Sequence, residues 1–151
     1  ESMFDLITCD TEFIVQNDMF DFIDGCLYYN ESLLYLSPSI EEFTITTERF
    51  TEIPSRYLQE EDGLKKVIIE EGITKIGNAL FYDCDGLTTV VIPSTVVEIE
   101  DYPFALCDNM KDIYYNGTKD QWDSIIKKDN WKHSLINVVL HCNDGDFIIN
   151  E

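Results

Sequence analysis

Residues 64–86 read LKKVIIEEGITKIGNALFYDCDG and residues 87–109 read LTTVVIPSTVVEIEDYPFALCDN, and the two stretches align without a gap. A third repeat unit begins at Met110. A fourth unit, which matches less closely and contains one inserted residue, begins upstream at Ile40. Stacked coils of this length can bury a hydrophobic edge that a single coil leaves exposed, so the repeat predicts a solenoid. The residues that recur are Leu64/Leu87, Val67/Val90, Ile69/Ile92, Ile73/Val96, Ile76/Ile99, Phe81/Phe104 and Cys84/Cys107.

The spacing inside each unit predicts how one coil folds. Val67 and Ile69 share one face of a short strand, because side chains alternate along a strand, and β-branched residues favour this conformation. A turn follows at Glu71–Gly72, and Ile73 and Ile76 then point back inward. We therefore expect a right-handed coil whose short strands form a parallel β-sheet.

The N-terminal third of the chain departs from this period. The apolar runs Cys26–Tyr29 and Leu33–Leu36 flank a short polar segment at 30–32, which predicts a β-hairpin. Terminal segments of a solenoid are atypical because they must cover an exposed core edge. We expect an N-terminal cap over residues 1–39 and repeat coils over 40–115, within one structural domain.

The C-terminal cap is expected over residues 116–151. Thr118 and Gln121 have the spacing of a capping box, and helical spacing of the apolar residues that follow predicts a helix from 119 to 128. The segment Leu135–Cys142 predicts a final strand. The cap should therefore consist of one helix and one strand.

The quoted units resemble the leucine-rich repeats of the BspA-like family. The segment Asp24–Tyr28 also resembles this family's Asp-Gly-x-Leu-Tyr hairpin, and 113–118 with Trp122 resembles its usual C-terminal ending. The resemblance covers residues 20 to 146, with departures such as Glu70 where Pro93 stands one unit later. It implies a leucine-rich-repeat solenoid in a secreted or cell-surface protein, with adhesion or recognition of a host protein as its function. It supplies no catalytic residues.

The composition is strongly acidic. The chain has 151 residues with 30 Asp+Glu against 10 Lys+Arg, a formal net charge of −20, and 44% hydrophobic residues, enough to fill a core. Such an excess repels phosphate backbones and anionic lipids, so we expect neither a nucleic-acid partner nor membrane insertion. A basic protein partner fits the charge, and residues 1–63 carry 15 of the acids.

The termini and cysteines bear on the cellular compartment. The chain does not begin with a basic segment followed by an apolar one, so the protein is either cytoplasmic or lacks its leader. Its cysteines are odd in number and include no Cys-x-x-Cys pair, which favours buried free thiols over a disulfide framework or a zinc site. A Cys84–Cys107 disulfide is compatible with the repeat, because the two cysteines lie one coil apart. The five cysteines are Cys9, Cys26, Cys84, Cys107 and Cys142.

The sequence offers no catalytic constellation. His133 and His141 are the two histidines, and His141 is expected to be a residue of the capping strand rather than a base. The acidic segments 83–86 and 144–146 lack the spaced oxygen ligands of a calcium loop and are expected to be turns. We therefore expect no enzymatic activity, no cofactor and no metal.

Residues that alternate with the inward ones form the candidate partner-binding face. A central row that includes an aromatic residue is flanked by charges, a pattern typical of interaction surfaces, unless another element covers it. We expect a non-enzymatic protein-binding module; the alternative is an acidic intracellular inhibitor or immunity-like protein that binds a basic partner. The candidate residues are Thr44, Thr46, Lys66, Ile68, Glu70, Thr89, Val91, Asp112 and Tyr114.

Overall fold

The computed structural model describes residues 20–23, 25–29 and 32–150. The chain divides into two compact units, one ending at Ser37 and the other beginning at Pro38. The boundaries expected at 39/40 and 115/116 remain predictions.

The first unit contains a three-stranded antiparallel sheet. It comprises β1 (Phe20–Ile23), β2 (Cys26–Tyr29) and β3 (Ser32–Leu36), with β2 in the middle. The pairing of β2 with β3 confirms the predicted hairpin, whereas β1 was not predicted. The polar residues Asn30 and Glu31 of the expected turn lie outside the described residues.

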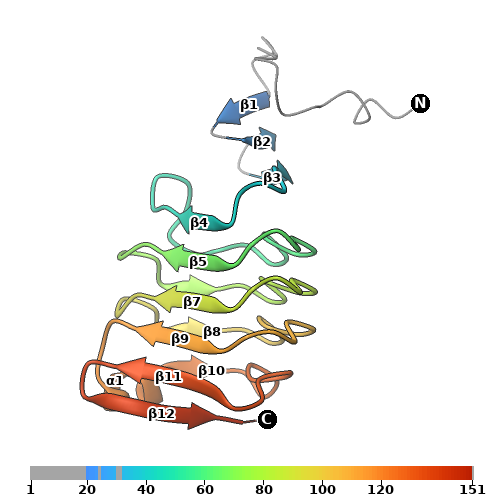
Figure 1. Ribbon diagram of the computed structural model, residues 1–151. Coiled ribbons are helices and arrows are strands. Elements are labelled where there is room, and N and C mark those ends of the chain that lie inside the picture. The colour runs from blue at the N-terminus through green and yellow to red at the C-terminus, as the bar shows by residue number, and fades with distance from the viewer. Residues whose placement is uncertain (1–19, 24, 30–31, 151) are drawn as a thin grey trace. The chain divides into compact units, whose positions relative to one another are not determined.

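The second unit is built around a six-stranded sheet, whose strands lie one beneath another in Figure 1. The strands β4, β5, β7, β9 and β11 pair in parallel, each with the next. The 23-residue interval holds from β5 to β9, so that Val67 lies beside Val90 and Val90 beside Ile113, whereas partners are 24 residues apart between β4 and β5 and 27 apart between β9 and β11. β12 pairs with β11 in the antiparallel direction and ends the sheet. The solenoid prediction is confirmed. In sheet order the strands are β12 (Gly145–Ile149), β11 (Val138–Cys142), β9 (Asp112–Tyr115), β7 (Thr89–Ile92), β5 (Lys66–Ile69) and β4 (Glu42–Ile45).

Each coil returns through a second, narrower sheet and then a side made of turns. The second sheet pairs β6 (Lys75–Ile76), β8 (Glu98–Ile99) and β10 (Ile126–Lys127) in parallel. On the side made of turns, backbone N–H groups donate to carbonyls of the next coil, as from Phe81 N to Pro103 O at 2.8 Å. All three sides of a coil therefore bond to the neighbouring coils.

The turns rely on left-handed backbone at positions that repeat with the coils. Glycine is the residue that most readily adopts positive φ, yet all of these positions carry other residue types. Because the same positions recur at 23-residue intervals, the strain belongs to the coil geometry and not to one side chain. The two sets are Arg56, Ala79 and Tyr102, and Glu60, Asp83 and Leu106.

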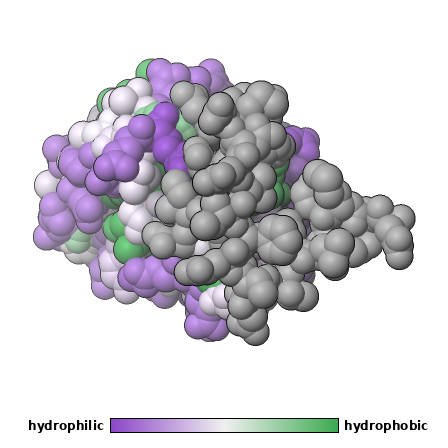
Figure 2. All heavy atoms as spheres, turned by 90° about the horizontal axis from the view of Figure 1, so that it is seen from above, coloured by the Kyte–Doolittle hydropathy of each residue, from purple (hydrophilic) through white to green (hydrophobic). Residues whose placement is uncertain are grey.

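The inward residues predicted from the repeat are buried and form much of the core. Phe81 and Phe104 are fully buried and stack with ring centroids 5.6 Å apart. Among the described residues Ser37 is the one buried polar or charged residue, and hydrophilic residues make up much of the described surface visible in Figure 2. The acidic excess is thus compatible with a continuous apolar interior.

Two cysteines form part of this core. The Cys84 thiol donates to Leu58 O at 2.8 Å, and the Cys107 thiol donates to Phe81 O at 2.9 Å. Burial raises the pKa of both thiols to about 12. Both are free thiols, as is the half-buried Cys142. Cys9 lies outside the described residues.

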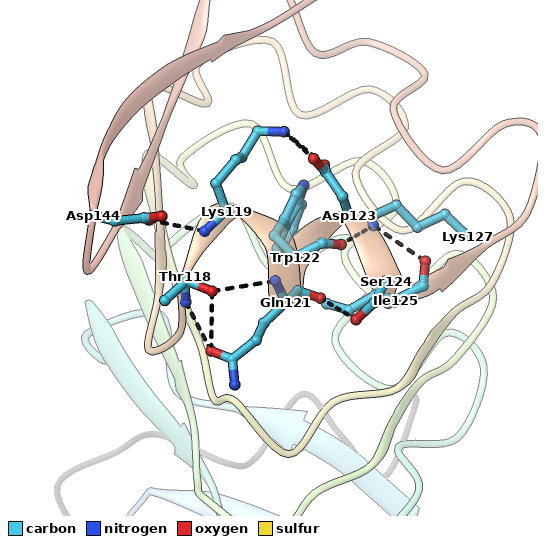
Figure 3. A network of polar contacts seen from close by, with 9 residues as sticks. All are labelled: Thr118, Lys119, Gln121, Trp122, Asp123, Ser124, Ile125, Lys127 and Asp144. Atoms are coloured by element: carbon cyan, nitrogen blue, oxygen red, sulfur yellow. Dashed lines mark hydrogen bonds and ion pairs between the residues drawn. The ribbon is translucent and has the colours of Figure 1, made fainter.

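The C-terminal helix α1 spans Lys119–Ser124, so the predicted end at 128 was wrong. The next residues leave the helix because Ile126 and Lys127 pair with β8 of the preceding coil. From outside the helix, the Lys127 ammonium donates to the carbonyls of Trp122 in the helix and of Ile125, the residue that follows it (Figure 3). Burial lowers the pKa of Lys127 to about 8.

The final strand was also predicted too long. β11 begins at Val138 and not at Leu135, because Asn137 has a left-handed φ of 55° that breaks extended structure. The following strand β12 was not predicted. It begins at Gly145, within the turn expected at 144–146, and Asn143 and Asp144 connect the two paired strands. The cap therefore contains a helix and two strands of the long sheet.

The capping box at the start of α1 is formed as predicted (Figure 3). Gln121 N donates to Thr118 Oγ1 at 3.3 Å, and Thr118 N donates to Gln121 Oε1 at 2.9 Å. We expect Thr118→Ala to lower the free energy of unfolding by about 1 kcal/mol, measured by urea denaturation. Thr118→Ser should keep most of this free energy, because serine also supplies a hydroxyl oxygen. Equal losses of free energy from both variants would contradict the capping role.

Candidate partner-binding face

The side chains of the long sheet that alternate with the buried ones form a surface that we call the outer face. Two rows of these side chains cross the six strands in hydrogen-bonded register. The central row consists of Thr44, Ile68, Val91, Tyr114, His141 and Asp146. The flanking row consists of Glu42, Lys66, Thr89, Asp112, Val139 and Ile148.

The structure brings together most of the residues predicted for this face. Thr44, Ile68, Val91 and Tyr114 occupy consecutive positions of one row, because the coils stack without a slip in register. Thr44 is exposed, Ile68 and Val91 are partly exposed, and Tyr114 is 43% exposed. The row therefore remains accessible to a partner.

Two of the predicted residues lie beyond the strand ends. Thr46 follows β4 and is partly exposed, and Glu70 follows β5 and is exposed. The Glu70 carboxylate accepts from Thr47 N and from Thr47 Oγ1, the latter at 2.7 Å. These hydrogen bonds lower the pKa of Glu70. Glu70 thus provides a fixed negative charge at the border of the face.

Charged side chains flank the central row. Lys66 Nζ lies 3.1 Å from Glu42 Oε2, so the one predicted base of the face is already paired. Asp112 and Asp146 bring further carboxylates at the C-terminal end of the face. An apolar strip with acidic flanks can contact a protein surface that offers apolar side chains between basic ones.

His141 is the functional candidate that the sequence did not reveal. Its ring stacks on Tyr114 with centroids 4.3 Å apart and an interplanar angle of 14°. Its Nε2 lies 2.9 Å from Asp112 Oδ1 and its Nδ1 lies 2.8 Å from Asp146 Oδ1. Hydrogen bonding to Asp112 and then to Asp146 raises the pKa of His141. His141 was expected in the capping strand, where it lies, but without a place on the outer face.

The opposite sheet presents a different surface. Lys75 Nζ lies 2.6 Å from Glu100 Oε1 and 3.4 Å from Glu98 Oε2, and Lys128 Nζ lies 3.6 Å from Glu98 Oε1. Acids and bases there neutralise one another. The outer face combines an accessible apolar row with acidic flanks, and it is therefore the better candidate for contact with a protein.

Other kinds of site find no support in the described part of the chain. Within residues 20–23, 25–29 and 32–150, no group of three or more His, Cys, Asp or Glu side chains is arranged to hold a metal ion. No helix in those ranges is both long and apolar enough to cross a membrane.

Known proteins with leucine-rich repeats resemble this chain. The chain is similar to a leucine rich cell surface protein from Faecalibacterium prausnitzii A2-165, with 17% identity, a TM-score of 0.34 and coverage of 73% of this chain and 43% of that one. It thus corresponds to less than half the length of that structure, and no curated protein matches. Leucine-rich repeats typically provide extended surfaces for protein interactions. Residues 16–129 match the model of the BspA type leucine rich repeat region in six copies, so the chain belongs to this family.

Proposed function

We propose that the chain is a non-enzymatic protein-binding module and that the outer face of the long sheet is its binding site. The observation that carries this proposal is the accessible row from Thr44 to Tyr114, held in register across four parallel strands. Each position of the row is provided by a different coil, so the row is fixed by the solenoid and needs little ordering on binding. Preorganisation of this kind favours affinity.

The charges of the face indicate the chemistry of the partner. Four carboxylates at or beside the face (Glu42, Glu70, Asp112 and Asp146) exceed the positive charges of Lys66 and protonated His141. The partner should therefore present apolar side chains between basic ones. The formal charge of −20 on the whole chain would also accelerate encounter with such a surface.

We further propose that the module serves adhesion or recognition of a host protein at the cell surface. Membership of the BspA-type family supports this role, since a stack of coils presents a long surface suited to proteins and not to small substrates. The location itself is part of the proposal.

Two substitutions on the outer face test the binding site. We expect Ile68→Asp with Tyr114→Asp to weaken binding at least about tenfold, because charges would replace the apolar centre of the contact. The measurement is surface plasmon resonance of the full chain against an array of purified extracellular-matrix and serum proteins.

A matched control exists on the opposite sheet. Val97 and Ile126 are 59% and 63% exposed, so Val97→Asp with Ile126→Asp introduces the same charges away from the outer face. This control should bind as the unchanged protein does, and circular dichroism should show both double variants folded. Unchanged binding by the Ile68/Tyr114 variant would rule out the proposed face.

The alternative function is supported by the net charge. An acidic inhibitor or immunity-like protein would capture a basic enzyme through long-range attraction, which salt screens over about 8–10 Å at 0.1–0.15 M ionic strength. Its association rate should then fall steeply from low to high salt. A nearly flat salt response would favour the apolar contact proposed here.

A further inference from the structure

The hydrogen bonds of His141 determine its protonation. A carboxylate only accepts hydrogen bonds, whereas a neutral imidazole has one N–H donor and one acceptor nitrogen. Both ring nitrogens of His141 face carboxylate oxygens, Asp146 Oδ1 at 2.8 Å and Asp112 Oδ1 at 2.9 Å. Only the imidazolium, with two N–H donors, satisfies both contacts. With both aspartates ionised, this geometry therefore favours a charged His141.

This imidazolium joins three strands. Asp112 and Tyr114 come from β9, His141 from β11 and Asp146 from β12. The charged ring also lies parallel to the Tyr114 ring, at a distance where a cation attracts the aromatic face. One proton thus controls two hydrogen bonds and the environment of the most exposed aromatic residue in the central row.

The other titratable groups nearby have different roles. Cys142 follows His141 on β11, and its side chain alternates to the other face of the strand. Asp144, in the turn before β12, accepts from Lys119 N at 2.8 Å. Asp112, Asp146 and Tyr114 are therefore the titratable groups that contact the imidazole directly.

We propose that His141 is a proton-dependent clamp that orders the C-terminal end of the outer face by holding Asp112, Asp146 and Tyr114 together. When the proton leaves, one nitrogen becomes an acceptor facing a carboxylate, and one of the two contacts must open. The proposal of a clamp depends only on the contacts of His141. Its role in controlling partner binding rests on the function proposed above.

The pH range follows from the direction of the pKa shift. The carboxylates raise the folded-state pKa of His141 above the ordinary value of 6.5. The stabilisation by the clamp is therefore complete below pH 6.5 and is lost as pH rises through the higher pKa of the folded protein. Tyr114 should be most ordered at the acidic side of this transition.

Proton NMR of the full chain tests the clamp without any partner. In a His133→Gln background His141 is the remaining histidine of the two, so its ring signals are assigned directly. We expect a titration midpoint above 6.5 and ring signals of Tyr114 that move with the same midpoint. Asp112→Asn and Asp146→Asn should each lower the midpoint.

Each outcome decides the inference. A midpoint at or below 6.5, or a midpoint unchanged by both asparagine variants, overturns the clamp. Tyr114 signals that do not follow His141 would overturn the ordering of the face. The midpoint measured in the His133→Gln chain does not depend on the asparagine variants, so it tests the clamp even if one of them fails to fold. Failure here leaves the binding test with Ile68 and Tyr114 unaffected, and failure of that test leaves the clamp intact.

Discussion

Phe104→Ala is expected to lower the free energy of unfolding by about 3–5 kcal/mol, the range for losing a buried aromatic side chain. Phe104 is fully buried and stacks on Phe81 of the preceding coil at 5.6 Å. Its removal leaves a cavity between two coils whose backbones are held by the sheets on either side, so the cavity cannot easily close. Equilibrium denaturation in urea, followed by circular dichroism, measures the loss.

The neighbouring Leu106 provides the control. It belongs to the same turn-rich side of the same coil but is 41% exposed, so Leu106→Ala should cost less than about 1 kcal/mol. Phe104→Leu should fall between the two, because it removes part of the volume and the ring stacking. Equal losses from Phe104→Ala and Leu106→Ala would show that the aromatic stack does not stabilise the solenoid.

Gly86→Ala is expected to cost about 3 kcal/mol, at the upper end for overpacking, because the new methyl group would collide with backbone. A Cβ at this position would lie 2.1 Å from Asp62 O and 2.7 Å from Leu64 O. Backbone cannot rotate away as a side chain can, so the two coils would have to separate locally. The shift of the thermal unfolding midpoint measures the cost.

The repeat supplies a control for Gly86 at the same position of the next coil. Asn109 lies 23 residues later and already carries a side chain, which donates from Nδ2 to Asp85 O at 2.8 Å. Asn109→Ala removes this exposed hydrogen bond and should cost about 0.5–1 kcal/mol. A Gly86→Ala variant as stable as the parent chain would contradict the close approach of the coils.

The coils and the outer face could be predicted because both follow from alternation and a fixed interval. Once Val67 and Ile69 are buried, Ile68 must point outward, and the 23-residue repeat places Val91 and Tyr114 beside it. His141 escaped this reasoning because the last coil is longer: His141 lies 27 residues after Tyr114, and the shared interval no longer identifies it.

The errors arose where pairing between coils overrides local preference. Trp122, Ile125 and Ile126 have helical spacing, but Ile126 pairs with Glu98 of the preceding coil and ends the helix. The left-handed positions were hidden for another reason. Their side chains share neither size nor charge, as Ala79 and Tyr102 illustrate, so composition does not reveal them.

The pairing of each strand only with its immediate neighbours has a thermodynamic consequence. β7 bonds to β5 and β9, and β5 bonds to β4 and β7, so stability is distributed over a chain of interfaces between adjacent coils. Within the long sheet, β4 pairs with β5 alone and β12 with β11 alone among the described strands, so these edge strands should separate more readily than the central ones. A partner lying across several coils would couple units that otherwise interact only in pairs. Binding would then make unfolding more cooperative, as well as less favourable.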